Sequence, residues 1–254
     1  MTEHKRYLPA ATTRFWRGVE PGTRRNPFDR DKDEQRAPEM AALRTATIDI
    51  VSRLTGTLDV VDIGCATGRV AYDMLSLQNV NSVTGIDVSP KALALATQKL
   101  KEHPRYSQRT VSLLEGDFLS DPTLLPPNAY DVVVSLELLD ILADPYEGLA
   151  RMYASLKPGG HLIGSWLSEE QLYKHYSKKR GRAVAAGKVI SVHAMPLITK
   201  TPGVRDFIGK RGYGRENPIR EADLPAVLIE QGFQIETIKP GEHFMFHAVK
   251  PNIL

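Results

Sequence analysis

The chain has 254 residues, 42% of them hydrophobic and 25% charged, with a formal net charge of +3 at pH 7. This composition is typical of a soluble protein with one large or two small domains, and the charge alone indicates no nucleic-acid partner. The single cysteine, Cys65, excludes an internal disulfide and a cysteine-rich metal site. There is no apolar run of about 18 residues, and residues 1–6 lack the apolar core of a signal peptide. We therefore expect a cytoplasmic protein with no membrane partner.

Residues 1–37 are predicted to form an N-terminal arm, because they are polar and basic and several prolines interrupt any long helix. The aromatic and basic cluster within this arm, residues 14–17, is either a lid over a substrate or a segment packed on the domain, and we favour packing. From Glu39 to Leu54 apolar residues recur at helical spacing. We expect this helix to begin the main domain, residues 38–254.

A buried strand, a tight glycine turn and a helix are predicted between Leu58 and about residue 75. A dinucleotide-binding turn requires Gly-x-Gly-x-x-Gly, but here only Gly64 and Gly68 are present, with Ala66 between them. Asp62 lies at the end of the strand, where its charge would repel a pyrophosphate and attract an ammonium or sulfonium group. The turn therefore favours a cationic adenosine ligand.

The following strands also end near polar side chains. Residues 82–87 form an apolar strand ending at Asp87, at a spacing from the turn that suits hydrogen bonds from both ribose hydroxyls. Ser89 and Pro90 then supply a helix N-cap and a first helical position. A third strand, about residues 110–114, leads to Gly116-Asp117-Phe118, and a fourth spans residues 129–137.

Residues 60–68, Val-Val-Asp-Ile-Gly-Cys-Ala-Thr-Gly, closely resemble the first motif of the class I S-adenosylmethionine-dependent methyltransferases, small-molecule type, usually written with glycine at position 66. Further family motifs follow in order at 116–118, at the Tyr-Asp-Val-Val start of the fourth strand, and at Leu-Lys-Pro-Gly-Gly, residues 156–160. They cover roughly residues 57–167. The resemblance implies an α/β fold: a Rossmann-like seven-stranded sheet with an antiparallel last strand and helices on both faces.

The resemblance also implies S-adenosyl-L-methionine as the cofactor and assigns roles to residues around it. Asp117 would contact the adenine amino group, and Phe118 and Val88 would lie beside the adenine ring. We interpret Cys65 as lining the cofactor turn rather than as a nucleophile. The expected cofactor-binding residues are Asp62, Gly64, Cys65, Ala66, Gly68, Asp87, Val88, Asp117, Phe118, Ser135 and Leu136.

The tail supplies a helix at 221–231 and two strands, 232–238 and 242–249. Their histidines, His243 and His247, are interpreted as structural rather than catalytic. About 50 residues, roughly 167–220, separate the fifth strand from that helix, more than a plain connection needs. We expect a cap insertion after the fifth strand. Its basic run, densest at 174–182, is either a solvated helix face or a site for an anionic small substrate, with a macromolecule as the least favoured interpretation.

Methyl transfer requires alignment and exclusion of water, and a general base where the acceptor carries a proton. Glu137 and Asp140 lie in a stretch that resembles Glu-x-Leu-Glu-His of the quinone-biosynthesis methyltransferases, but Ile141 replaces the histidine. We therefore expect no metal. The candidate catalytic residues are Glu137, Asp140 and, in the cap, His193, with His175 as a further histidine there.

The sequence thus predicts an S-adenosylmethionine-dependent methyltransferase that acts on oxygen, nitrogen or carbon of a small, anionic or neutral metabolite. Two alternatives stay open. A peptide or protein methyltransferase would use the basic cap and the N-terminal arm, and a non-methylating S-adenosylmethionine-binding protein would explain the missing family histidine. A nucleic-acid partner is disfavoured, because there is no Asn-Pro-Pro-Tyr motif. No particular oligomeric state is indicated.

Overall fold

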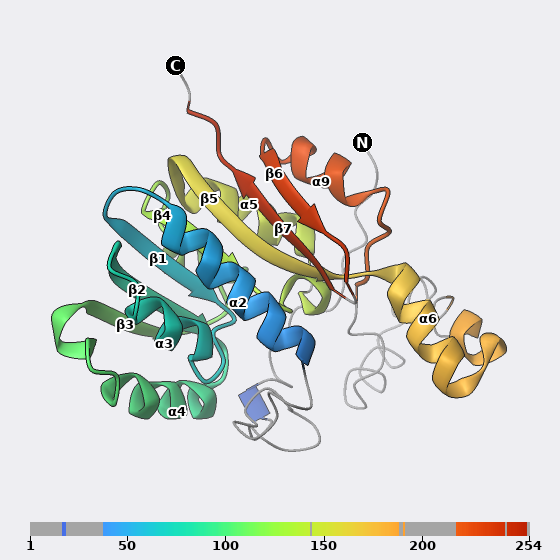
Figure 1. Cartoon of the computed structure of the whole chain (residues 1–254), viewed down its shortest axis with the longest axis horizontal. Coiled ribbons are helices and arrows are strands. Elements are labelled where there is room, and N and C mark those ends of the chain that lie inside the picture. The colour runs from blue at the N-terminus through green and yellow to red at the C-terminus, as the bar shows by residue number, and fades with distance from the viewer. Residues whose placement is uncertain are drawn as a thin grey trace.

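The computed structural model describes residues 17–18, 38–142, 144–187, 190, 217–241 and 243–252. These residues form one seven-stranded sheet with the strand order β3-β2-β1-β4-β5-β7-β6 (Figure 1). The strands are β1 (Leu58–Ile63), β2 (Val80–Asp87), β3 (Thr110–Glu115), β4 (Tyr130–Ser135), β5 (Leu156–Leu167), β6 (Gln234–Lys239) and β7 (His243–Val249). Strands β1 to β5 pair in parallel, and β7 runs antiparallel to both β5 and β6. The predicted Rossmann-like sheet with an antiparallel last strand is confirmed.

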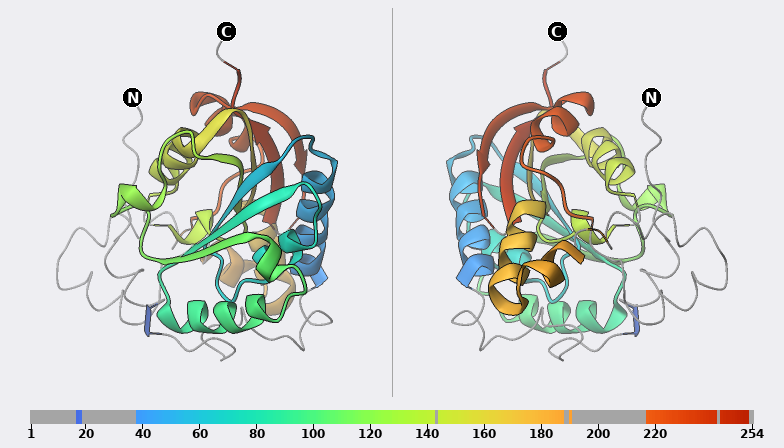
Figure 2. Two further views of the ribbon diagram at one scale, coloured as in Figure 1. Left: turned by 90° about the vertical axis from the view of Figure 1, so that its left-hand side faces the viewer. Right: turned by 90° about the vertical axis from the view of Figure 1, so that its right-hand side faces the viewer.

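Helices cover both faces of the sheet, as the two side views in Figure 2 show. One face carries α2 (Pro38–Arg53), α3 (Arg69–Leu75) and α4 (Pro90–Lys101), and the other carries α5 (Pro145–Ser155) and α9 (Leu224–Glu230). Short 3₁₀ turns lie at η1 (Tyr106–Gln108), η2 (Pro122–Leu124) and η3 (Leu139–Ile141). The helices bury the parallel strands from both sides, so both faces of the sheet carry apolar side chains. The buried helix residues against the first face include Leu43, Val51, Ala71, Met74 and Leu100, and those against the second Leu149, Met152, Leu224 and Leu228.

Helix starts follow the predicted capping chemistry. The Ser89 hydroxyl accepts a hydrogen bond from the backbone N–H of Ala92, and Pro90 occupies the first helical position of α4. Asp144 caps α5 in the same way. The motif at residues 156–160 lies inside a strand: β5 already begins at Leu156, which pairs with Tyr130, and Gly159 (φ +76°) lies where the register between β4 and β5 shifts. A Pro-Gly-Gly sequence is compatible both with a turn before a strand and with an irregular first part of the strand itself.

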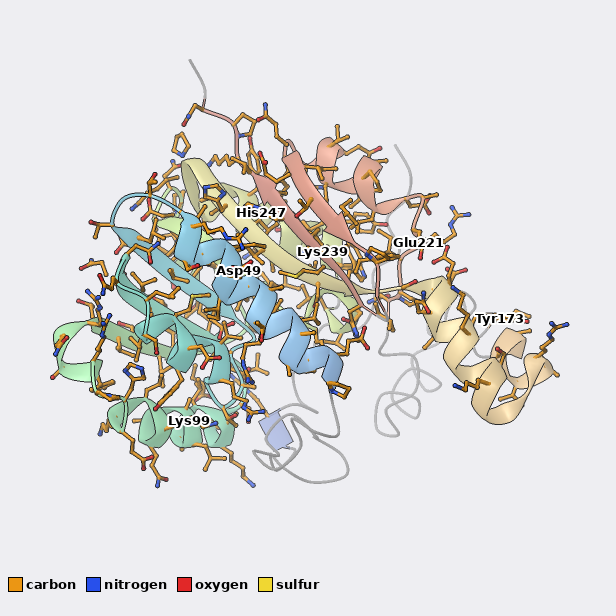
Figure 3. All side chains as sticks on the ribbon, in the orientation of Figure 1. Asp49, Lys99, Tyr173, Glu221, Lys239 and His247 are labelled. Carbon is orange, nitrogen blue, oxygen red and sulfur yellow. The ribbon has the colours of Figure 1, made fainter. Side chains whose placement is uncertain are left out.

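The insertion after β5 is tied together at its two ends. Helix α6 (Glu169–Arg180) leaves the sheet directly after β5, and Figure 3 shows Tyr173 on it beyond the sheet edge. Where the chain returns, the N–H of Ile219 donates to the carbonyl of Leu167 (2.9 Å), and the N–H of Glu169 donates to the carbonyl of Ile219 (3.0 Å). The cap stays a prediction, because residues 191–216 lie outside the described ranges.

Of the N-terminal arm, only residues 17 and 18 are described. Arg17 belongs to the predicted aromatic and basic cluster, and its Nε donates to the carbonyl of Val88 (3.3 Å) while its guanidinium lies 3.6 Å from the Glu115 carboxylate. Both partners lie at the carboxyl ends of strands, since Val88 follows β2 and Glu115 is the last residue of β3. The other residues of the cluster, and with them the choice between lid and packed arm, lie outside the described residues.

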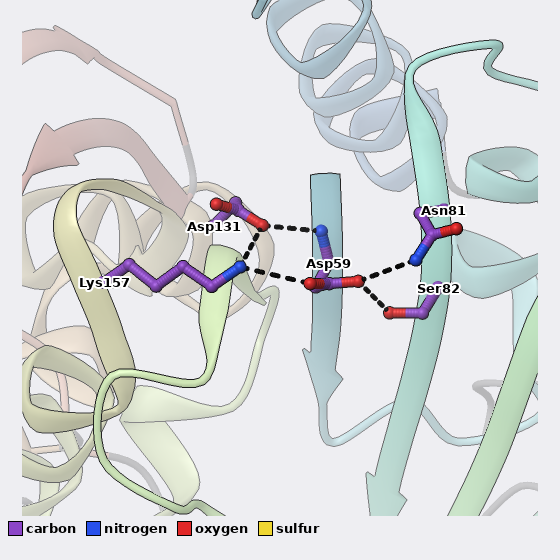
Figure 4. Close-up of polar contacts among 5 residues, drawn as sticks. All are labelled: Asp59, Asn81, Ser82, Asp131 and Lys157. Carbon is purple, nitrogen blue, oxygen red and sulfur yellow. Dashed lines mark hydrogen bonds and ion pairs between the residues drawn. The ribbon is translucent and has the colours of Figure 1, made fainter. Parts of the chain in front are cut away.

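The amino ends of the central strands are joined by a polar network, shown in Figure 4. Lys157 lies between the carboxylates of Asp59 (3.1 Å) and Asp131 (2.7 Å), and Asp59 also accepts hydrogen bonds from Ser82 (2.7 Å) and Asn81 (3.2 Å). The hydrogen bond from Ser82, opposed by partial burial, lowers the pKa of Asp59, while that to Asp131 raises the pKa of Lys157. This edge is occupied by its own side chains, whereas ligands of open α/β sheets generally bind at the carboxyl edge.

Candidate active site

The turn between β1 and α3 requires its glycines. Gly64 (φ +75°) and Gly68 (φ +76°) both adopt the left-handed backbone conformation that glycine tolerates best. A Cβ atom on Gly64 would lie 3.1 Å from the Leu138 side chain. The N–H groups of Gly64 and Cys65 both donate to the carbonyl of Ile86, at 2.8 and 3.1 Å. These bonds hold the turn against the end of β2.

Cys65 points away from solvent into the space that a side chain on Gly85 would fill. Its Sγ lies 2.8 Å from the position of a Cβ on Gly85, and the residue is buried. Burial, together with the charges of Asp62 and Asp87, raises the pKa of the Cys65 thiol. A neutral buried thiol is a poor nucleophile. The geometry supports the interpretation that Cys65 shapes the turn.

Asp62 is a buried carboxyl group with unused hydrogen-bonding capacity. It is 3% exposed, and among the described residues its Oδ2 has no hydrogen-bond partner. Burial, and secondarily the charge of Asp87, raises the pKa of Asp62 to about 7, against a hydrogen bond from the backbone N–H of Ala71 in α3. Buried acceptors are normally satisfied, so this one suits a ligand that brings a donor or a positive charge.

Asp87 stabilises the turn through both of its carboxylate oxygens. Its Oδ2 accepts a hydrogen bond from the N–H of Ala66 (2.9 Å), and its Oδ1 accepts one from the N–H of Ser89 (2.8 Å). Ala66 has φ +45°, so the backbone of the turn is left-handed here too. Burial raises the pKa of Asp87 and these backbone bonds oppose the rise. A carboxylate has about four lone-pair sites, so two hydroxyl donors can still bind.

Asp117 and Phe118 follow β3 with different environments. Asp117 accepts hydrogen bonds from the N–H of Leu119 (3.0 Å) and the hydroxyl of Ser120 (3.3 Å), which fixes the loop locally. Phe118 is 4% exposed and belongs to the hydrophobic core on the α5 face. The contact of Phe118 with an adenine ring stays a prediction. Val88 is tied through its carbonyl to Arg17.

The end of β4 and the residues after it contain two predicted cofactor-binding residues and two candidate catalytic residues. Ser135 is fully buried, with no hydrogen-bond partner for its hydroxyl among the described residues, and Leu136 is partly buried against the hydrophobic core on the face that α2, α3 and α4 cover. Glu137 has φ +52°, unusual for a non-glycine residue, and its N–H donates to the Ser165 hydroxyl (2.7 Å). Asp140 lies in η3 and is 5% exposed.

His243, interpreted from the sequence as structural, lies at this same edge of the sheet, and its role stays a prediction. His243 begins β7 and pairs with Leu167, and its Nδ1 lies 3.6 Å from Oε1 of Glu137. The signal was present in the sequence: the first residue of a reversed strand lies at the same edge as the last residues of parallel ones. The candidate catalytic residue His193 lies outside the described residues, as does the side chain of His175.

Two general properties of the described part of the chain bear on the site. Within it, no three His, Cys, Asp or Glu side chains are grouped so that they could hold a metal ion. None of the helices seen there combines the length and the apolar character of a membrane-spanning segment.

Comparison with known proteins places these features in context. The family described as "Methyltransferase domain" matches residues 61–162. The ubiquinone biosynthesis O-methyltransferase of Nitrosospira multiformis is 32% identical over 133 residues, 51% of this chain and 51% of the relative. That of Pseudomonas putida strain GB-1 is 30% identical over 214 residues, 83% of this chain and 79% of the relative. Several curated relatives, including the first, are matched over only about half of their own length.

Solved structures agree with the observed sheet. A SAM-dependent methyltransferase from Methanosarcina mazei superposes with a TM-score of 0.57 at 22% identity, over 81% of this chain and 98% of that chain. At this identity the likeness concerns the fold.

Proposed function

Because the chain belongs to the class I S-adenosylmethionine-dependent methyltransferase family, we propose that it transfers a methyl group to an oxygen atom of a small molecule. The observation that carries this proposal is the pair of proton-accepting side chains, Glu137 and His243, at the edge where the cofactor turn lies. A hydroxyl acceptor must lose its proton, so it needs such a group more than a neutral amine does. The relatives named O-methyltransferases support the same acceptor atom.

The residues at the carboxyl edge fit S-adenosyl-L-methionine. The unpartnered Oδ2 of Asp62 suits the positive charge of the ligand, and the remaining lone pairs of Asp87 suit its ribose hydroxyls. Gly64 and Gly68 let the turn pack against Leu138 and Ala96, where a Cβ atom would lie only 3.1 and 3.0 Å from these side chains. When bound, the cofactor supplies an electrophilic methyl group on a positively charged sulfur.

The chain's own contribution is alignment and proton removal. Holding donor and acceptor at near-attack distance and excluding water supply most of the acceleration in such displacements. The insertion leaves the sheet after Leu167 and returns at Ile219, which is hydrogen-bonded to Leu167. Both ends of the insertion therefore lie at the edge of the sheet where Glu137 lies. We assign acceptor binding to this edge of the sheet, on the side where α6 begins.

The charge of α6 favours an anionic acceptor. Lys174 and Lys178 are four residues apart on this helix and both are exposed, so they lie on one side of it. Exposed cations attract anionic ligands over roughly one Debye length, about 8 Å at physiological salt. We propose that the acceptor carries a carboxylate or phosphate in addition to its hydroxyl.

A transfer assay tests the proposal. Purified protein is incubated with methyl-labelled S-adenosylmethionine and either 3,4-dihydroxybenzoate, catechol or a fractionated extract of its source cells, and products are separated by mass. We expect label in a low-mass methyl ether, with the carboxylate-bearing probe preferred to catechol, and a loss of that preference when Lys174 and Lys178 become Gln. Label retained on protein or nucleic acid, or tight cofactor binding without any transfer, would overturn the proposal.

A further inference from the structure

Asn217 lies where the insertion returns to the sheet, and three of its polar groups make hydrogen bonds to other segments. Its backbone N–H donates to the carbonyl of Asp140, and its side-chain Nδ2 donates to the carbonyl of Leu142 (2.8 Å). Its own carbonyl accepts a hydrogen bond from the indole Nε1 of Trp166 (2.6 Å). This one half-buried residue therefore joins the return of the insertion both to the end of β5 and to the segment that follows β4.

The segment that Asn217 holds is residues 138–142, here called the β4 loop, which contains η3. The loop forms one turn, in which the N–H of Leu142 donates to the carbonyl of Leu138 (3.1 Å). Asp140 and Leu142 are only 5% and 8% exposed, so their carbonyls depend on donors from the protein rather than on water. Asn217 supplies one donor to each of these two carbonyls. The position of the β4 loop therefore depends on the return of the insertion.

The first residue of the β4 loop lies against the cofactor turn. A Cβ atom on Gly64 would be 3.1 Å from Cδ1 of Leu138, which is tighter than most real contacts of this kind, so the Leu138 side chain covers the turn directly. The N–H of Gly64 in turn donates to the carbonyl of Ile86 at the end of β2 (2.8 Å). Close contacts thus run without a break from the cofactor turn through the β4 loop to Asn217. Close-packed interiors transmit small displacements, so a change at either end of this series is felt at the other.

We propose that Asn217 is a positioning residue that couples the binding of the acceptor to that of the cofactor, an inference that rests on the proposed function. Through the β4 loop, the arrangement of the cofactor turn that binds its ligand favours the arrangement in which the return of the insertion is fixed beside the acceptor. Such coupling is reciprocal, so each ligand raises the affinity for the other by the same factor. Energetic couplings between two sites commonly amount to about 5- to 100-fold in affinity.

The indole signal of Trp166 tests this connection without any acceptor. The chain has two tryptophans, so the spectrum of Trp16→Phe identifies which indole cross-peak of the wild-type ¹H–¹⁵N spectrum belongs to Trp166. We expect this signal to shift as S-adenosylhomocysteine is added to the wild type, and the shift to be much smaller in Asn217→Ala at equal saturation. A wild-type Trp166 signal that does not respond to the ligand would overturn the proposal, as would an equal shift in folded Asn217→Ala.

The matched control is Asn79, at the opposite edge of the sheet. Asn79 is half-buried like Asn217, and its Nδ2 donates to two backbone carbonyls, those of Val51 (2.8 Å) and Leu54 (2.9 Å). Asn79 immediately precedes β2, so it lies at the amino edge, away from the cofactor turn. Asn79→Ala therefore removes the same chemical group from a comparable environment. It should lower the free energy of unfolding as Asn217→Ala does, but should keep the response of Trp166 to the ligand.

Calorimetry tests the coupling itself, with 3,4-dihydroxybenzoate as the acceptor and saturating S-adenosylhomocysteine as the cofactor product. The acceptor affinity should rise about 5-fold or more with S-adenosylhomocysteine in the wild type and in Asn79→Ala. The rise should disappear in Asn217→Ala, whose affinity for S-adenosylhomocysteine alone should be unchanged. Trp166→Phe, which removes the indole donor to Asn217, should reduce the rise as well, and it decides the question if Asn217→Ala does not fold.

The outcomes separate this inference from the proposed function. A rise in acceptor affinity that persists in folded Asn217→Ala and in Trp166→Phe would overturn the coupling role alone, since binding and transfer by the wild type would still stand. If the wild type neither binds nor methylates a small-molecule acceptor, the proposed function fails instead. The indole signal of Trp166 would then still decide whether Asn217 connects the insertion to the cofactor turn.

Discussion

Cofactor binding should be coupled to the release of a proton from Asp62. Burial and the nearby charge of Asp87 raise the pKa of Asp62 to about 7 in the ligand-free protein. A positive charge beside the unpartnered Oδ2 favours the ionised carboxylate, so the bound protein gives up the proton that the free protein holds. Below pH 7 binding must displace that proton, and affinity falls as the pH is lowered.

The magnitude follows from linkage. With one proton displaced, affinity falls about tenfold for each pH unit below the pKa, so the loss is about tenfold at pH 6 and about 100-fold at pH 5. Asp62→Asn keeps the size of the side chain and an oxygen for the N–H of Ala71 but removes the charge. This variant should bind more weakly at pH 8 and should lose most of the pH dependence between pH 8 and 5.

Isothermal titration calorimetry with S-adenosylhomocysteine measures both quantities. Titrations in two buffers with different heats of ionisation count the protons released, and we expect close to one at pH 6 and close to none at pH 8.5. Methylthioadenosine, which lacks the charged amino-acid part, is the matched control ligand and should release fewer. The reasoning about Asp62 is refuted if wild-type affinity is constant from pH 5 to 8, or if Asp62→Asn retains the same slope while still folded.

Three further outcomes are expected. Asp87→Ala should weaken S-adenosylhomocysteine binding by about 1–3 kcal/mol through lost hydrogen bonds, measured by calorimetry; unchanged affinity would contradict its assignment. Nδ1 of His161 and Nε2 of His247 lie 2.9 Å apart, and burial, followed by the charge of His161, lowers the pKa of His247 to about 4. The unfolded chain therefore binds more protons between about pH 6.5 and 4, and the free energy of unfolding should fall by about 1–2 kcal/mol as the pH drops through that range, after allowance for solvent screening. Urea denaturation checks this, and His247→Gln should flatten the dependence. Glu137→Gly should be about 1 kcal/mol more stable in denaturation than Glu137→Ala, because glycine relieves the left-handed backbone; equal stabilities would argue against strain.

The donor half of the site could be predicted from local pattern. Buried parallel strands are short apolar runs, and the residues that follow them lie at one edge of the sheet. The structure places Asp62, Asp87 and Asp117 at or just after the ends of β1, β2 and β3, where the sequence placed them. Each prediction depended on a segment of a few residues, so neither strand register nor long-range contacts were needed.

The acceptor half depends on contacts that local pattern does not contain. His243 meets Glu137 only because β7 pairs with β5 in a register that sets His243 opposite Leu167. Asn217, which the sequence did not single out, donates through Nδ2 to the carbonyl of Leu142 (2.8 Å) and accepts at its own carbonyl from Trp166 (2.6 Å). The hydrophobic pattern along one strand does not show which residues of another strand it faces, because a shift of one residue in register changes every cross-strand partner.

The strand order also explains why the two halves can be read separately in experiments. Asp87 ends β2 and His243 begins β7, and β1, β4 and β5 lie between them. Four strand spacings of about 4.8 Å separate their strands by about 19 Å, beyond the range in which substitutions usually couple. Glu137 and His243, 3.6 Å apart, are within that range. Changes at Asp62 or Asp87 should therefore act through cofactor affinity. Changes at Glu137 and His243 should act together on proton removal, because the reversed direction of β7 brings His243 to the edge of the sheet where Glu137 lies.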